Sequence, residues 1–273
     1  MNIEKIKNYN HKILAVLGTF LLLIAIISLI LLTVFAIGEL SRSSRYNRHD
    51  DGILSDEKIE ELQKQNKRKQ LISYETPKLV DSLNLIYMIP VTHKTLNREE
   101  FIEEEYLMEL SNDYSLGKNY SQKYYGDFNN LLIYDYKNHN IDKLFEDRVN
   151  FESIQTEYFS DEILILFKAS TKDTYKDGII NQLDHKTLFI YSLTTKDLKE
   201  IKLENADISE VDFVESSKDL ILKFGIDHNK DGKFDEYSEP TVIKKYDYEN
   251  GELIDIISQE INIELQKKLE GTK

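Results

Sequence analysis

The sequence predicts a mainly all-β protein, built from repeated four-stranded units and preceded by one long apolar helix. Three hairpin-like segments carry a Tyr at the same place, at Tyr134, Tyr191 and Tyr246, which lie 57 and 55 residues apart. The chain contains 17 Tyr and 12 Phe, and aromatic residues of this kind favour β-strands. Residues 13–38 carry no charge, which indicates an apolar helix before the β domain.

The charge and composition of the chain exclude several classes of function. The 273 residues carry a formal net charge of −14, with a pI of about 5.0. Nucleic-acid phosphates require a basic surface, so we expect no nucleic-acid partner. An acidic surface suits the binding of cations instead. The absence of Cys excludes disulfides, a thiol nucleophile and a thiolate metal site.

After a short tail at 1–12, we predict a transmembrane helix at 13–40. At ~1.5 Å per residue, the uncharged run is long enough for the ~30 Å hydrocarbon core of a bilayer. A cleaved signal peptide is the alternative, but the apolar region of a signal normally covers only ~7–15 residues. Basic residues flank both ends almost equally, yet long domains cross membranes largely regardless of charge. We therefore expect a single-pass membrane protein whose C-terminal domain is extracytoplasmic.

Short helices are expected on both sides of the β domain. Residues 41–70 are expected to form a linker and a short charged helix, which we place at Lys58–Gln70 with Ser55 as a cap. Ile261–Leu269 is expected to be the last helix, and its apolar side chains should pack on the sheet.

The β domain is expected at 71–273, with an insertion at 94–128. Its first strand, Leu85–Ile89, should stop at Pro90, because proline lacks a hydrogen-bond donor. Within the insertion we expect an acidic helix at 98–110, followed by a polar segment that is rich in Tyr. Exposed aromatic side chains favour interfaces, so the insertion is a candidate for contact with a partner protein. A lid that covers the domain's own core is the alternative.

Matching strands define the repeat. Each Tyr-containing strand is followed by a turn and a second short strand, and Asn250-Gly251 in the last turn is a strong hairpin signal. Ile163–Phe167 and Leu220–Phe224, 57 residues apart, add an earlier strand to two of the units. Over Leu85–Ser258, this order of elements resembles the blades of TolB-type and WD-type propellers. Propellers usually close with about four to eight blades, so the resemblance implies propeller-like units in an incomplete ring.

The most specific motif is Asp227-His228-Asn229-Lys230-Asp231-Gly232-Lys233-Phe234-Asp235, which resembles the calcium loop of EF-hand proteins. In such loops, oxygen atoms at six positions bind the ion, and a Gly makes a sharp turn. The expected ligands are Asp227, Asn229, Asp231, the Lys233 carbonyl and Asp235. Ser238 stands where the final carboxylate belongs, so either Glu239, in a loop one residue longer, or Glu236 would replace it. A polar turn that binds no ion is the alternative.

A weaker copy of the loop lies upstream, at 173–184. Tyr175 stands at its third position and cannot act as a carboxylate ligand, so a water would fill that place. The expected ligands are Asp173, Asp177, the Ile179 carbonyl, Asn181 and Asp184. Both loops fall between the second and third strands of a repeat unit. Ca²⁺ is therefore the expected cofactor, and we expect it to order the loops without taking part in chemistry.

The sequence shows no catalytic constellation. No two of the six His have metal-ligand spacing, and there is no nucleophile elbow or phosphate-binding Gly loop. His139 and His185 fall in predicted turns, where we expect solvated side chains. The expected function is a membrane-anchored, calcium-stabilised module for protein interaction, with a protein partner or self-association. A metal-assisted hydrolase with an extracytoplasmic domain is the alternative.

Overall fold

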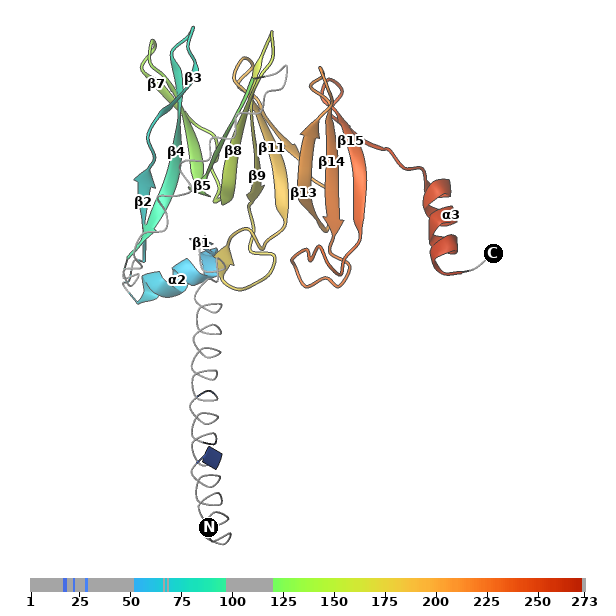
Figure 1. The fold of residues 1–273 in the computed structure, drawn as a ribbon. Coiled ribbons are helices and arrows are strands. Elements are labelled where there is room, and N and C mark those ends of the chain that lie inside the picture. The colour runs from blue at the N-terminus through green and yellow to red at the C-terminus, as the bar shows by residue number, and fades with distance from the viewer. Residues whose placement is uncertain are drawn as a thin grey trace, which may run out of the picture. The chain divides into compact units, whose positions relative to one another are not determined.

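A computed structural model describes residues 52–65, 67, 69–96 and 120–271, together with residues 17, 18, 22 and 28. The chain divides into two units, 1–50 and 51–273, and the second contains the β domain (Figure 1). The expected helix at 98–110, the tail at 1–12 and nearly all of the expected span at 13–40 lie outside the described residues. Among the described residues, no helix is both long and apolar enough to cross a membrane.

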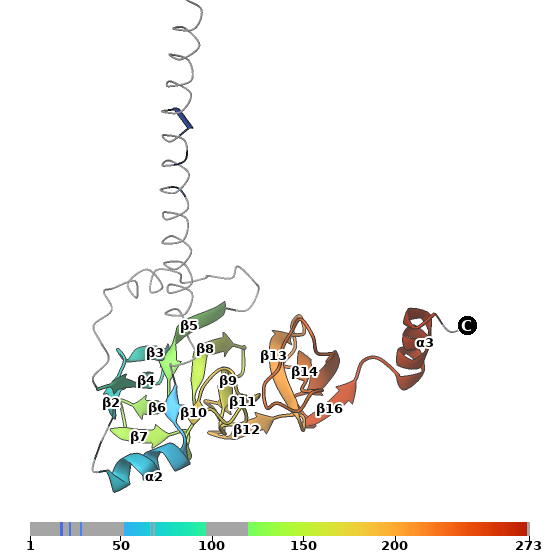
Figure 2. The same cartoon turned by 90° about the horizontal axis from the view of Figure 1, so that it is seen from below.

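The fold of the second unit is mainly β, as expected. Its described residues form three large antiparallel sheets, which follow one another in the order of the chain except that β5 of the second sheet precedes the last two strands of the first (Figure 2). The first sheet contains β2 (Gln70–Tyr74), β3 (Lys78–Asp81), β4 (Ile86–Thr95), β6 (Asn130–Asp135) and β7 (Asn140–Lys143). The second contains β5 (Tyr120–Phe128), β8 (Phe151–Tyr158), β9 (Ile163–Ser170), β11 (Lys186–Ser192) and β12 (Leu198–Ile201). The third contains β13 (Ala206–Phe213), β14 (Leu220–Ile226), β15 (Thr241–Asp247) and β16 (Glu252–Asp255).

Smaller elements accompany the three sheets. The strands β1 (Ile53–Leu54) and β10 (Ile179–Ile180) form a two-stranded antiparallel sheet of their own. The helix α2 (Asp56–Lys64) follows β1, and α3 (Gln259–Leu269) follows the third sheet. In the second and third sheets, consecutive strands β8-β9-β11-β12 and β13-β14-β15-β16 each pair with their neighbours in chain order. Both are therefore four-stranded meanders, and β5 adds a fifth strand to the edge of the second sheet.

Strand β9 of the second sheet is buried on both faces, which explains its continuous apolar run from Ile163 to Phe167. On β9, Ile165 and Phe167 belong to the core that includes the first sheet, whereas Leu164 and Leu166 belong to the core shared with the third sheet. Successive side chains of a strand point to opposite faces, so a strand between two cores must be apolar at every position. All four side chains are at most 3% exposed. The middle sheet therefore joins the other two into one domain.

The repeat seen in the sequence extends to the backbone of the turns. The turn after β6, the turn after β11 and the turn after β15 each contain one residue with positive φ, at His139 (53°), Lys196 (63°) and Gly251 (72°). Each of these residues stands five positions after the equivalent Tyr of its strand. Only Gly adopts this conformation without steric cost, so the shared turn outweighs local preference at His139 and Lys196. The expected strands and hairpins of the three units are confirmed.

Two expected element boundaries are wrong. The strand expected to stop at Pro90 continues as β4 to Thr95, because Pro90 lies between the part of β4 that pairs with β3 and the part that pairs with β2. On the edge of β4 that faces β2 and β3, no strand residue lies opposite Pro90, so its missing N–H is tolerated. The helix expected to reach Gln70 ends at Lys64, and Gln70 begins β2. Ser55 is its N-cap residue but makes no side-chain capping hydrogen bond.

Two expectations about packing also change. The last helix forms, and Ser258 caps it by accepting a hydrogen bond from the Ile261 N–H. Its apolar side chains do not pack on a sheet, since Ile261, Leu265 and Leu269 are 50%, 55% and 82% exposed. The C-terminal part of the expected insertion, from Tyr120, is the strand β5, which pairs with β8 and shifts register between Tyr125 and Phe128.

Candidate functional site

The two predicted calcium loops connect equivalent strands and lie at the same end of their sheets (Figure 1). The upstream loop, 173–184, joins β9 to β11, and the downstream loop, 227–239, joins β14 to β15. Their backbones match: Lys176 and Lys230 have φ of 61° and 62°, and Gly178 and Gly232 have φ of 89° and 88°. The Gly in each motif therefore stands where the turn requires positive φ.

The first Asp of each loop holds the turn by accepting backbone hydrogen bonds. Asp227 accepts from the N–H of Lys230 at 2.6 Å and from that of Gly232 at 3.0 Å. Asp173 accepts from the N–H of Asp177 at 3.2 Å and from that of Gly178 at 2.9 Å. In both loops the carboxylate thus reaches the N–H of the turning Gly, which places the first expected ligand on the inner side of the turn.

A second carboxylate closes each loop by accepting hydrogen bonds from the loop backbone. Asp184 accepts hydrogen bonds from the N–H groups of loop residues two, three and nine, which are Thr174 (2.6 Å), Tyr175 (3.0 Å) and Asn181 (2.9 Å). Glu239 accepts from the same three loop positions, at His228 (2.8 Å), Asn229 (3.1 Å) and Asp235 (2.9 Å). Glu239 is therefore the counterpart of Asp184, and its extra methylene spans a loop that is one residue longer.

Ser238, which stands at the twelfth loop position, and Glu236, the other candidate carboxylate, face elsewhere. Ser238 donates its hydroxyl to Asp235 at 2.6 Å, and Glu236 lies 3.6 Å from the Lys223 ammonium. Both side chains are thus engaged outside the position that Glu239 occupies.

The two closing carboxylates differ in their electrostatics. Burial raises the pKa of the Asp184 carboxyl, although three N–H donors oppose this shift. The N–H of Asp235, together with those of Asn229 and His228, lowers the pKa of the Glu239 carboxyl. Asp184 is 1% exposed and Glu239 is 9% exposed. A cation beside Asp184 would reverse its shift, because an opposite charge favours the ionised form.

The remaining predicted ligands also lie in their loops. Asp231 and Asp177 each accept a hydrogen bond from the N–H two residues later, at Lys233 (3.1 Å) and Ile179 (2.9 Å). The side-chain oxygens of Asn229 and Asn181 accept from N–H groups in the same way. A carboxylate oxygen has a second lone pair, so these hydrogen bonds do not use up its capacity to bind a cation.

The donor set suits a hard cation, but the side chains are not gathered as a closed cluster. All expected ligands offer oxygen, which Ca²⁺ prefers. Among the described residues, no group of three or more His, Asp or Glu side chains meets as a metal centre does. An EF-hand-like site also takes ligands from Asn side chains and backbone carbonyls. A cluster counted from His, Asp and Glu side chains alone does not include these ligands.

The two loops contact each other, which the sequence did not reveal. Thr174 donates its hydroxyl to the Gly232 carbonyl at 2.5 Å, and the Lys233 ammonium lies 4.5 Å from the centre of the Tyr175 ring. His185 Nε2 lies 3.3 Å from Asp227 Oδ2, at ion-pair distance but without the alignment of a hydrogen bond. The expectation of a solvated His185 is therefore wrong. The one sequence signal for a buried place was that His185 directly follows Asp184, the last residue of the upstream loop.

The upstream loop also holds the chain that enters the β domain. β1 pairs with β10, which is part of the loop, and the Ser55 N–H donates to the Gly178 carbonyl at 2.9 Å. The Gln70 side chain donates to the Gly52 carbonyl at 2.7 Å. Residues 52–55 are thus fastened to the loop by backbone hydrogen bonds and to the start of β2 by the Gln70 side chain.

Comparison with known proteins adds no family to this description. No protein-family model matches the chain, and no curated protein matches it either.

Proposed function

We propose that this chain is a single-pass, membrane-anchored β-repeat module whose paired loops bind Ca²⁺ and which docks a protein partner. The observation that carries the calcium proposal is the duplicated loop geometry. Both loops have the same positive-φ turn, the same first Asp and a closing carboxylate that accepts from the same three loop positions. A plain polar turn needs only part of this arrangement.

Calcium would be held by oxygen atoms of residues already placed in each loop. The downstream site would use Asp227, Asn229, Asp231, the Lys233 carbonyl, Asp235 and Glu239. The upstream site would use Asp173, Asp177, the Ile179 carbonyl, Asn181 and Asp184. When bound, the ion would offset the repulsion between the carboxylates of each loop, and the protein would gain stability without any chemical step.

The propeller-like and interaction parts of the proposal rest on the stacked meanders. The third sheet ends the series of large sheets in the part of the chain that the structure describes, and its strand β16 has a neighbour on one side only. Open sheet edges pair readily with other chains unless they are covered. A partner protein or a second copy of the chain would complete such an incomplete ring.

Membrane attachment is supported by the uncharged residues 13–38 alone. Protease added to intact cells tests the proposed orientation. Digestion of the β domain is expected if it is extracytoplasmic, and full protection in intact cells, with digestion after lysis, would contradict this orientation.

Calcium binding is tested by calorimetry and by thermal melts of the full-length chain in mild detergent. With a dissociation constant of ~0.1 mM and ~1 mM Ca²⁺, each occupied site stabilises by roughly 1.4 kcal/mol. This corresponds to a rise in melting temperature of roughly 3–6 °C per site for a domain of this size. Glu239→Gln should remove the gain from the downstream site, and Glu204→Gln, an exposed acid outside the loops, should not.

Identical melts with calcium and with a chelator, together with no calcium heat, would show that the loops are plain turns. Turnover of phosphoesters or glycosides that is lost in Asp231→Ala would instead favour the metal-assisted hydrolase.

A further inference from the structure

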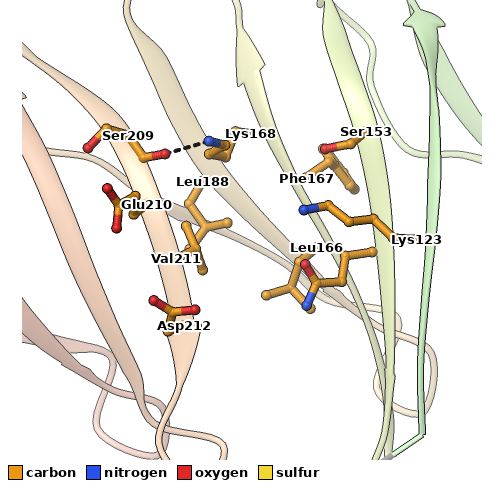
Figure 3. Close-up of a pocket in the computed structure, with 11 residues that line it drawn as sticks. Lys123, Ser153, Leu166, Phe167, Lys168, Leu188, Ser209, Glu210, Val211 and Asp212 are labelled. Atoms are coloured by element: carbon orange, nitrogen blue, oxygen red, sulfur yellow. Dashed lines mark hydrogen bonds between the residues drawn. The ribbon is translucent and has the colours of Figure 1, made fainter. Parts of the chain in front are cut away.

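A pocket of about 240 Å³ lies between the second and third sheets, away from the residues of the two loops. Strands β5, β8, β9 and β11 line it on one side, and residues 209–212 of β13 line it on the other (Figure 3). The pairing of β13 with β14 shifts register between Ile208 and Glu210, so Ser209 lies in a bulge. The bulge directs the Ser209 carbonyl to the pocket, where it meets Lys168.

Two lysines, Lys123 on β5 and Lys168 on β9, line the pocket from the second sheet. Lys168 donates to the Ser209 carbonyl at 2.6 Å, and Lys123 lies 5.5 Å from the centre of the Tyr125 ring. Neither ammonium forms an ion pair with any residue that the structure describes, in a chain with a formal net charge of −14. The neighbouring Lys186, by contrast, is paired with Asp207 at 3.0 Å.

Lys168 stands in surroundings that disfavour its charge. It is half-buried on a strand whose neighbouring residues Phe167 and Ala169 are buried. Burial lowers the pKa of the Lys168 ammonium, and the positive charges of Lys186 and Lys123 lower it further, while the negative charges of Asp207 and Glu152 oppose this shift without reversing it. A charge removed from water is costly unless an opposite charge compensates for it. An anion bound between Lys168 and Lys123 would supply that compensation.

The opposite wall limits how much negative charge the ligand carries. Glu210 and Asp212 stand on β13 across the pocket from the two lysines (Figure 3). Glu210 is paired with Lys223 at 2.8 Å, and Asp212 is exposed. These carboxylates would repel a second negative group, so a ligand with one negative charge fits better than a dianion.

The remaining lining mixes the polar residues Ser153 and Gln155 with hydrophobic residues. Leu166, Leu188 and Val211 contribute hydrophobic side chains between the charged walls. Ligand pockets commonly measure about 300–1,000 Å³, so this pocket suits a body of only a few carbon atoms.

We infer that this pocket binds a small monocarboxylate, with its carboxylate between Lys123 and Lys168 and its short apolar body against Leu166, Leu188 and Val211. This inference does not depend on calcium binding. Each lysine supplies a charge-assisted hydrogen bond to the ligand, and the apolar residues exclude water from its body.

The test uses the full-length chain in detergent and butyrate as the probe. Relaxation of the butyrate methyl protons, corrected for detergent alone, should report binding in about the millimolar range expected for so small a ligand. Butyramide has the same shape without the charge and should bind at least roughly tenfold more weakly. Inorganic phosphate should not compete, because of the carboxylates opposite.

Variants separate the pocket from general surface charge. Lys168→Gln and Lys123→Gln should each weaken butyrate binding roughly tenfold or more, and Lys94→Gln, on an exposed part of β4, should leave it unchanged. Lys123 lies on the edge strand β5, so its variant tests the pocket even if Lys168→Gln fails to fold. Equal binding of butyrate and butyramide, stronger binding of phosphate, or binding unchanged in both pocket variants would overturn the inference.

Discussion

The contact between the two loops predicts that Gly232→Ala destabilises the protein much more than Gly178→Ala. Both glycines make the same turn, with φ of 88° and 89°, so an alanine in either place bears the same conformational cost of about 1–2 kcal/mol. Their surroundings differ. A Cβ on Gly232 would lie 1.9 Å from the Thr174 carbonyl oxygen, whereas a Cβ on Gly178 would meet no atom within 4 Å.

The clash at Gly232 involves backbone, which cannot rotate away, so the upstream loop must shift. Overpacking of this kind typically costs a further ~1–3 kcal/mol. At roughly 2–4 °C per kcal/mol, Gly232→Ala should melt roughly 2–12 °C below Gly178→Ala. Thermal melts by circular dichroism, with chelator present in every sample, measure this difference without any contribution from bound ions. Coincident melts of the two variants would refute the contact between the loops. They would not contradict the positive-φ turn within each loop.

Three further predictions concern the loops, Glu162 and the last helix. Glu162 precedes β9 of the second sheet and lies 2.7 Å from the ammonium of Lys218, which precedes β14 of the third sheet. Asp231→Ala should abolish the downstream part of the calcium-dependent rise in melting temperature, and Asp177→Ala should reduce the rise by less; equal losses would contradict the ranking of the two sites. Burial raises the pKa of Glu162, but hydrogen bonds led by that from Lys218 outweigh it and lower the pKa below the ordinary 4.5. The stability contributed by this carboxylate is therefore present at neutral pH and lost as the pH falls through its folded-state pKa. Glu162→Gln should cost about 1.5–3 kcal/mol by urea denaturation at pH 7 and progressively less at acid pH, and a constant loss at all pH values would refute this role. Deletion of residues 259–273 should change the stability of the β domain by less than about 0.5 kcal/mol, because the side chains of α3 are exposed; a larger loss would show that the helix packs on the domain.

The strand pattern and the position of both loops were predictable because their causes are local. Alternating or continuous apolar residues mark strands such as Ile163–Ser170, and Gly178 and Gly232 mark turns that require positive φ. The 57-residue and 55-residue spacings then placed equivalent strands in successive units. These features depend on a few neighbouring residues, so they can be predicted from one sequence.

Contacts between residues distant in the chain were not predictable in this way. Because proline lacks an N–H donor, the sequence predicted a strand end at Pro90. β4 continues past Pro90 because its partner strand on one edge changes there from β3 to β2. Ile261 and Leu265 had the spacing of a packed helix face, yet α3 leaves both exposed. In each case the outcome depended on which partner was present, which a local pattern does not specify.

The sequence by itself determined the β repeat, its turns and the two acidic loops, because side-chain alternation and backbone φ act over a few residues. Only the tertiary structure decided that Glu239 closes the downstream loop, since three N–H groups from separate parts of that loop must converge on one carboxylate. It also decided that the loops contact each other at Thr174 and Gly232, and that Lys123 and Lys168 share a pocket. The contact between the loops arises because the second and third sheets stack, which brings together residues from different repeat units. Lys123 and Lys168 share a pocket because β5, which is distant from β9 in the chain, joins the edge of the same sheet.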